Sequence, residues 1–412
     1  MISRRYEALD FMILTTEKHI PPYIFEYVDF DGRVDIDRLV TAVGRVGAIV
    51  PETLYRLDSR RLRFKEAGFT PRDVVIEEDH ALDCGPTWDL RHDTQVKIHI
   101  IHGPDADSMV MGMSHYLSDG AGVMQYTTLL GEGYQGECPD VHNNRSSQAI
   151  VAASKFDPPT QGETRSRQFP PMALPIPHTG TDHFCRHITL PQSTMKTLRD
   201  VAKSHSLSLN DVFLAASARV ACRMMDMTTM PMRCPVNLRP FIDAGPLTVA
   251  NMTGLYAMTV DVDPGDSFST TAQRVHQEVA ASRERGRHFF DMPTLVGLTR
   301  RYPIGMLRRS MAKTYRVRPV EYTNIGVLPP LVFGNVNAVS AYMTGAYGAY
   351  PEVPISISGF SGLTTFATTI EGDSARADAA EDVVRLIIGE FGDWLAEDGS
   401  AGGCRTPSAR GV

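Results

Sequence analysis

The sequence predicts an α/β protein built as two lobes. Three observations support this fold class: the length of the chain, the alternation of strand and helix patterns along it, and a proline-rich stretch near its middle. At 412 residues, the chain exceeds the roughly 250–300 residues at which one hydrophobic core usually stops growing. Residues 157–179 concentrate prolines, a composition that makes a poor core element and a good spacer. We therefore expect an N-terminal lobe at 1–156, a linker at 157–179, a C-terminal lobe at 180–397 and a disordered tail at 398–412.

The N-terminal lobe begins with hydrophobic patterns of both the strand period and the helix period. Strand-forming residues precede a turn at Asp31-Gly32, and Asp35 then offers an N-cap to a helix whose apolar face ends at Pro51. Strict alternation of apolar and polar residues follows, and a turn at 103–105 makes it a hairpin. The predicted elements are a strand at 23–30, a helix from Asp35 to Pro51, strands at 96–100 and 108–114, and a helix from Gly120.

The C-terminal lobe mixes strands with helices, as an α/β or α+β lobe does. Its predicted strands are at 183–190, 232–238, 249–262, 320–327 and 354–370. Its predicted helices are at 193–204, 211–225, 267–285, 292–312 and 378–397.

Composition excludes several classes of function. Hydrophobic residues make up 42% and charged residues 22%, which are ordinary globular values. A net charge of −7 gives no electrostatic footprint for nucleic acid. The six cysteines are scattered without a C-x-x-C pair, which argues against a zinc site or a disulfide framework. No apolar run approaches membrane-spanning length. We expect a cytoplasmic monomer with no metal, no bound cofactor and no membrane span.

Two basic clusters stand out against the acidic balance. They are Arg60, Arg61 and Arg63, and then Arg300, Arg301, Arg308 and Arg309. Each is either a solvated face or a patch for an anion or a carrier protein, and solvated faces are the commoner arrangement.

The strongest chemical signal is the segment Ser114-His115-Tyr116-Leu117-Ser118-Asp119-Gly120. His115 stands where a predicted strand ends, and Gly120 opens a helix whose first N–H groups point into the same space. A neutral imidazole there can accept a proton from a hydroxyl or amine. The backbone N–H of Gly120 can stabilise the oxyanion that forms when such a nucleophile attacks a carbonyl. The alternative is a strand-end histidine that a local carboxylate satisfies, and spacing alone does not separate the two.

This segment resembles the active-site motif shared by nonribosomal-peptide condensation domains, BAHD acyltransferases, and polyketide-associated or wax-ester-type acyltransferases. Other segments resemble the same superfamily, in the same order along the chain. They lie at 32–39, 208–216, 235–240, 323–326 and 358–362. The order of the segments carries the resemblance more than any one of them.

The resemblance implies two chloramphenicol-acetyltransferase-like lobes with a substrate tunnel between them. A donor thioester and an acceptor would enter from opposite faces and meet at His115, the general base. Asp119 would turn away from the substrate and pair with Arg239, since a carboxylate at such a cleft needs a cationic partner. Ser114 and Ser118 are candidates to line the active site.

Two departures narrow the resemblance. Condensation domains usually carry a second histidine directly before the catalytic one, and here that residue is Ser114. The Asp-Phe-Gly-Trp-Gly motif of the BAHD branch is reduced to Phe333-Gly334. The resemblance therefore favours the polyketide-associated, alcohol and wax-ester-type branch.

The implied function is transfer of an acyl group from a thioester to a hydroxyl of a lipid or secondary-metabolite acceptor. Coenzyme A or a phosphopantetheinyl carrier protein would bear the thioester, so an acyl or peptidyl carrier protein is a candidate partner. Two alternatives stay open: an amide-forming, free-standing condensation enzyme, and a non-catalytic relative that binds a carrier protein or a ligand. The intact trio of His115, Asp119 and Arg239 favours an enzyme.

Overall fold

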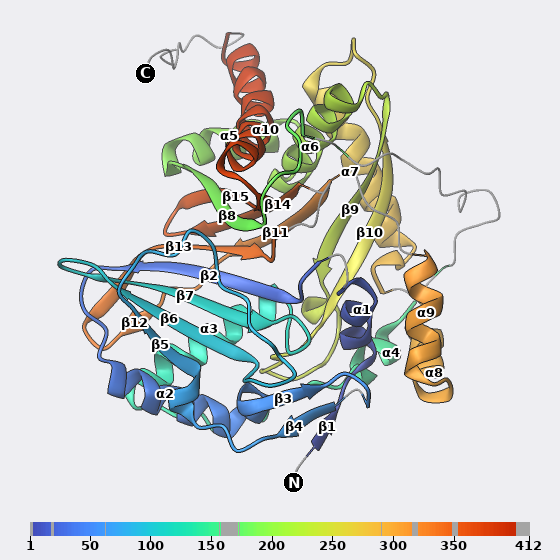
Figure 1. The fold of residues 1–412 in the computed structure, drawn as a ribbon. Coiled ribbons are helices and arrows are strands. Elements are labelled where there is room, and N and C mark those ends of the chain that lie inside the picture. The colour runs from blue at the N-terminus through green and yellow to red at the C-terminus, as the bar shows by residue number, and fades with distance from the viewer. Residues whose placement is uncertain are drawn as a thin grey trace.

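The strands of the protein form two main sheets in two lobes (Figure 1). Each sheet packs against helices through its own hydrophobic core, which confirms the predicted two-lobe α/β class. The structure is a computed structural model that describes residues 3–17, 20–61, 63–155, 157, 172, 174–289, 291–314, 320–347 and 353–400.

The helices and strands follow one another along the whole described chain. In order they are β1 (Ser3–Arg5), α1 (Ala8–Thr16), β2 (Tyr23–Phe30), α2 (Ile36–Ile49), β3 (Tyr55–Asp58), β4 (Arg63–Glu66), β5 (Val75–Glu78), β6 (Val96–His102), β7 (Asp107–Ser114), α3 (Gly120–Gln135), α4 (Gln148–Ala153), β8 (Asp182–Leu190), α5 (Gln192–Ser204), α6 (Leu209–Met225), β9 (Thr229–Asn237), β10 (Thr253–Asp261), α7 (Phe268–Glu284), α8 (Met292–Arg301), α9 (Ile304–Thr314), β11 (Glu321–Val327), β12 (Val332–Phe333), β13 (Val336–Gly345), β14 (Pro354–Phe360), β15 (Leu363–Gly372) and α10 (Ser374–Ser400).

The N-terminal sheet has the strand order β12-β13-β2-β7-β6-β5. The predicted hairpin is present as β6 and β7, and β7 also pairs with β2, so that Tyr23 lies opposite Ser114. Helix α2 begins as expected, because the side chain of Asp35 accepts a hydrogen bond from the Arg38 N–H. Together, β2 and β7 place the residue after Ser114 at one end of the sheet, facing the other lobe.

Two strands of this sheet, β12 and β13, come from the C-terminal half of the chain. β13 pairs antiparallel with β2, from Ala338 opposite Phe30 to Gly345 opposite Ile24. The predicted segments 1–156 and 180–397 therefore do not coincide with the two lobes, because part of the second segment belongs to the sheet of the N-terminal lobe. Strand patterns show that a segment is extended, and they do not show which distant strand it pairs with.

The C-terminal lobe contains the sheet β11-β14-β15-β8 and the long hairpin of β9 and β10. Helix α6 is buried along most of its length, as a central helix must be. Two predicted elements are divided. Pro303 separates α8 from α9 where one helix at 292–312 was expected, because proline cannot continue a helix. Ser361 and Gly362, both at positive φ, turn the expected strand at 354–370 into the hairpin of β14 and β15.

The two sheets meet where β13 lies beside β14. The Ser358 hydroxyl accepts a hydrogen bond from the Met343 N–H, and the Ser356 hydroxyl accepts one from the Gly345 N–H. We call this contact the β13–β14 seam. It joins the lobes through side-chain hydroxyls instead of a backbone ladder.

The predicted linker and tail lie mostly outside the described residues. Within 157–179 the structure describes 157, 172 and 174–179, and the tail is described only to Ser400. Helix α10 includes 398–400, so the helix extends three residues into the expected tail. None of the helices in the described ranges combines the length and the apolar character needed to cross a bilayer.

Gly254 in β10 shows how closely the C-terminal elements approach. A Cβ atom there would lie 1.9 Å from the His288 carbonyl oxygen, and a backbone atom cannot move aside as a flexible side chain can. We expect Gly254→Ala to lower the free energy of unfolding by about 1–3 kcal/mol through overpacking, measured by urea denaturation. Gly265→Ala is the control, because its Cβ would meet no atom within 4 Å. Equal stabilities of the two variants would contradict the close approach.

Candidate active site

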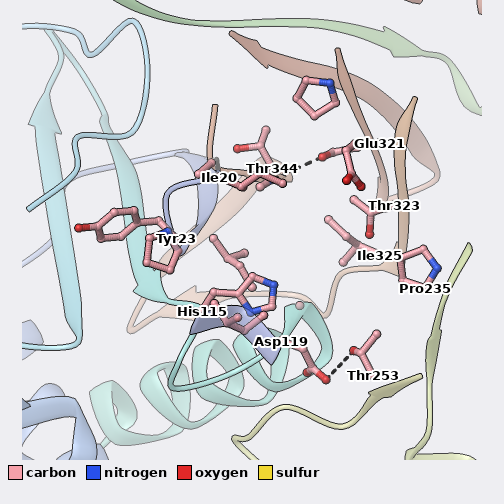
Figure 2. A pocket seen from close by; sticks show the side chains of 18 of the residues that line it. Ile20, Tyr23, His115, Asp119, Pro235, Thr253, Glu321, Thr323, Ile325 and Thr344 are labelled. Atoms are coloured by element: carbon pink, nitrogen blue, oxygen red, sulfur yellow. Dashed lines mark hydrogen bonds between the residues drawn. The ribbon is translucent and has the colours of Figure 1, made fainter. Parts of the chain in front are cut away.

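His115 follows directly on the end of β7. Its backbone N–H donates to the Pro22 carbonyl at 2.7 Å, and its own carbonyl accepts from the Asn251 side chain at 2.9 Å. The residue is therefore fixed between the loop before β2 and a segment that belongs to the C-terminal half. Its side chain faces a cavity (Figure 2).

Asp119 forms the N-cap of α3. Its carboxylate accepts a hydrogen bond from the Gly122 N–H at 2.9 Å, from the Met252 N–H at 2.7 Å and from the Thr253 hydroxyl at 2.7 Å. The expected ion pair is also present: Nη2 of Arg239 lies 3.0 Å from Oδ1 of Asp119. Because donors surround both oxygens, this carboxylate is engaged with protein groups instead of with the space around His115.

These partners decide the charge of Asp119. Burial acts to raise the pKa of its carboxyl, but the Arg239 guanidinium and the hydrogen bonds from Thr253 and Gly122 outweigh it and hold the pKa below the ordinary value. The ionised form therefore contributes stability above the ordinary carboxyl pKa. That contribution is lost as the pH falls through the lowered folded-state pKa.

Arg239 in turn clamps the segment 247–252, which directly precedes β10 in the C-terminal half of the chain. Its guanidinium donates to the Thr248 hydroxyl at 2.6 Å and to the carbonyls of Thr248 and Ala250 at 2.7 and 2.9 Å. We call 247–252 the crossing segment, because it also bonds to the N-terminal lobe. There the Thr248 N–H donates to Gln125 and the Val249 N–H donates to Asn143. The expected strand at 249–262 begins only at Thr253 for this reason.

A buried polar network behind the histidine was not predicted. The Arg145 guanidinium lies 2.8 Å from the Asp10 carboxylate and donates to the carbonyls of Leu117 and Val249. Asn251 donates to Asp10 at 2.8 Å as well as to His115. The network fixes the turn at 115–117 from behind. A single arginine in an irregular segment has no spacing that could have revealed this role.

The cavity beside His115 has a volume of about 360 Å³ and both halves of the chain line it. Its wall is mostly apolar or neutral, and among the described residues that line it the acids are Asp119 and Glu321, with no lysine or arginine. The N-terminal half supplies Leu9, Met12, Ile13, Ile20, Pro21, Pro22, Tyr23, Ile24, His115, Asp119 and Gly120. The C-terminal half supplies Pro235, Asn251, Thr253, Gly254, Leu255, Glu321, Tyr322, Thr323, Ile325, Thr344, Gly345, Ala346, Pro354, Ile355 and Ser356.

A second cavity of about 250 Å³ shares two lining residues with the first, Pro22 and Tyr23 at the start of β2. Tyr116, the residue after the histidine, also lines it, together with Trp88 and Arg91. The turn that carries His115 is therefore next to two cavities. A continuous tunnel open at both faces stays a prediction.

The imidazole of His115 has no carboxylate partner among the described residues. Desolvation by burial lowers its pKa below the ordinary value, although the nearby Asp119 carboxylate acts in the opposite direction. The imidazole is thus neutral near pH 7. This arrangement disfavours the alternative in which a local carboxylate satisfies the histidine, since Asp119 is bound to Arg239.

Gly120 lies at the cavity wall, whereas the two serines of the motif are not among the lining residues. Gly120 begins α3 and lines the cavity, so an N–H of the first helical turn, which has no partner within the helix, lies at the wall. Ser114 and Ser118 are fully buried and are not among the lining residues. The Ser118 hydroxyl donates to the Ala250 carbonyl instead. Gly122 is a further requirement that the motif did not show, because a Cβ there would lie 1.9 Å from the Ser118 oxygen.

The fold and this site resemble those of the condensation-domain and chloramphenicol-acetyltransferase-like superfamily. Residues 182–336 match the family model described as phthiocerol/phthiodiolone dimycocerosyl transferase C-terminus. This match covers less than half of the chain and agrees with the superfamily predicted from the motifs. No protein among the curated sequences matches the chain.

Solved structures share the fold over nearly the whole chain. Polyketide synthase associated protein 5 from Mycobacterium tuberculosis is 14% identical with a TM-score of 0.65, and the match covers 93% of this chain and 97% of that one. The first condensation domain of the calcium-dependent antibiotic synthetase, in complex with a substrate analogue, is 15% identical with a TM-score of 0.64, at 95% and 96% coverage. A variant of the starter condensation domain of rhizomide synthetase, in complex with C8-CoA, is 14% identical with a TM-score of 0.63, at 94% of both chains.

We expect Arg239→Ala to lower the free energy of unfolding by about 3–5 kcal/mol, because it leaves the buried Asp119 carboxylate without its cation. Urea denaturation at neutral pH measures this. Arg385→Ala is the matched control: Arg385 pairs with Glu381 on the surface, and exposed pairs contribute less than about 1 kcal/mol. If Arg239→Ala melted like the wild-type protein, the clamp on the crossing segment would not be needed for stability.

Proposed function

We propose that this chain is an acyltransferase that moves an acyl group from a thioester to a hydroxyl group, with His115 as general base. The observation that carries the proposal is the neutral imidazole of His115, which faces a cavity next to the start of α3 and has no carboxylate partner in the described structure. A group in that state is ready to accept a proton.

The reaction can be written from these residues. The imidazole of His115 accepts the hydroxyl proton of the acceptor as the oxygen attacks the thioester carbonyl carbon. The resulting oxyanion lies within reach of the N–H of Gly120 at the helix start. Collapse of the tetrahedral species breaks the carbon–sulfur bond, and the imidazolium returns its proton to the leaving thiolate. Ester and free thiol are the products, and the base is regenerated.

The wall of the cavity supports a long apolar acyl chain or a lipid acceptor. Leucine, isoleucine, methionine and proline side chains from both lobes contribute to it, and burying such a chain is favourable at roughly 0.8 kcal/mol for each CH₂ group. The family description for 182–336 names a dimycocerosyl transferase, and one similar condensation domain was solved with C8-CoA. Both names are compatible with an acyl thioester of coenzyme A or of a carrier protein as the donor.

A hydroxyl acceptor is favoured over an amine because Ser114 stands where condensation domains usually carry a second histidine. This serine is buried behind the cavity wall, so it offers no base to an ammonium group. The amide-forming alternative remains the second candidate, since condensation domains share this fold. A non-catalytic binding role would not require a neutral histidine and the start of a helix to lie together at the cavity.

The direct test is His115→Ala with a panel of acyl thioesters and alcohols, followed by free thiol release. We expect kcat to fall about 10²–10⁴-fold, the usual contribution of a positioned general base. Stability should change little, because the side chain makes no ion pair. His80→Ala, at an exposed position, is the control. Equal turnover of the two variants would remove the general-base role, and no turnover by the wild-type protein on any thioester would favour a binding protein.

The pH dependence should report the environment of His115. Because burial lowers the pKa of this imidazole, the base remains deprotonated at neutral pH and is lost only as the pH falls through the lowered value. We expect the acid limb of kcat/KM to have its midpoint below the ordinary histidine pKa of about 6.5. A midpoint above that value would assign the limb to another group.

A further inference from the structure

The helices α8 and α9 form a hairpin with an unusual balance of charge. Residues 292–314 contain four arginines and one lysine and no aspartate or glutamate, although the chain as a whole carries −7. Three of the arginines, Arg300, Arg301 and Arg309, are exposed and make no ion pair within the described residues. The hairpin is therefore a local positive patch on an acidic protein.

Large apolar side chains are exposed on the same hairpin. Leu298, Tyr302 and Met306 have 38%, 40% and 49% of their surface exposed. Six large hydrophobic residues in the described chain are this exposed, and half of them fall within these nine positions. We call these three together with Arg300, Arg301 and Arg309 the basic hairpin surface.

The hairpin is attached firmly at its inner side. Met292 and Leu307 are buried in the neighbouring cores, and Arg308 forms an ion pair with Glu17 at the end of α1. Other residues therefore anchor the two helices, and the exposed apolar residues are not needed for this packing. They are exposed on an anchored pair of helices, which Figure 1 shows at the edge of the molecule.

The basic hairpin surface is also close to the cavity. Helix α1 packs against α8 and α9, and Leu9, Met12 and Ile13 of the same helix line the cavity. On the C-terminal side, the chain leads from α9 to β11, whose Tyr322 and Thr323 line it too.

We propose that the basic hairpin surface binds an anionic lipid bilayer. The guanidinium groups would contact lipid phosphates, while the leucine, tyrosine and methionine side chains enter the boundary between head groups and acyl chains. The presence of exposed arginines and exposed apolar side chains on the same two helices favours this occupant, because the interface between head groups and acyl chains accommodates both kinds of side chain. The inference goes beyond acyl transfer and does not need it, since binding is measured without turnover.

The test is cosedimentation of the full chain with vesicles of phosphatidylcholine, with and without about 30% phosphatidylglycerol. We expect binding to the anionic vesicles that weakens as salt screens the charges. The variant Arg300→Gln/Arg301→Gln/Arg309→Gln should bind at least about tenfold more weakly, and Leu298→Gln/Tyr302→Ser/Met306→Gln should also lose affinity. The control Arg60→Gln/Arg61→Gln/Lys196→Gln makes the same change in net charge at exposed positions elsewhere and should bind as the wild type does.

Each other outcome overturns the proposal. Failure of the wild-type protein to bind anionic vesicles would exclude it, and equal loss in the control variant would reduce the effect to net charge. If vesicle binding were absent while the arginine variant lost activity only with carrier-bound thioesters, the surface would belong to a protein partner. His115→Ala should bind vesicles normally, so a failure of the catalytic role and a failure of this inference are distinguishable. Melting curves of the surface variants exclude unfolding as the cause of a loss.

Discussion

The carboxylate of Asp119 caps a helix of one lobe and holds an arginine of the other. Through Arg239 it also fixes the crossing segment 247–252, which supplies Asn251 both to the carbonyl of His115 and to the cavity wall. The position of the histidine relative to both lobes therefore depends on one buried charge pair. Replacing it by apolar residues of equal volume would satisfy the core, but it would leave α3 uncapped and the crossing segment without its donors.

The sequence predicted the parts of the site that follow from local geometry. A strand end, a histidine and a helix start lie within seven residues, so their proximity needs no knowledge of the fold. The pairing of Asp119 with Arg239 came from resemblance, since 120 positions separate the two residues and no periodicity connects them. The place of Ser114 and Ser118 in the active site stays a prediction, because both side chains are fully buried and neither is among the residues that line the cavity.

What could not be predicted is almost entirely long-range. β12 and β13 join a sheet whose other strands, β2 and β5 to β7, lie far before them in the sequence, and Arg145 reaches Asp10 across 135 positions. Such contacts are decided by how complete elements pack, and neither hydrophobic spacing nor turn chemistry carries that information. Charge was informative in a different way. In the sequence, the arginines at 300–309 are compatible with an ordinary solvated face. The exposure of the apolar residues near them depends on the packing of the helices and is seen only in the structure.

The β13–β14 seam has a consequence for how this fold could change its substrates. Gly345 and Ser356 contribute both to the seam and to the cavity wall, and the link between them is a single hydroxyl whose size sets the spacing of the two strands. A larger or smaller side chain at position 356 would shift this part of the cavity wall. His115, helix α3 and the crossing segment would keep their contacts with one another. Under the proposed acyl transfer, the seam would therefore set the room for the acyl chain, while other residues hold the reacting groups.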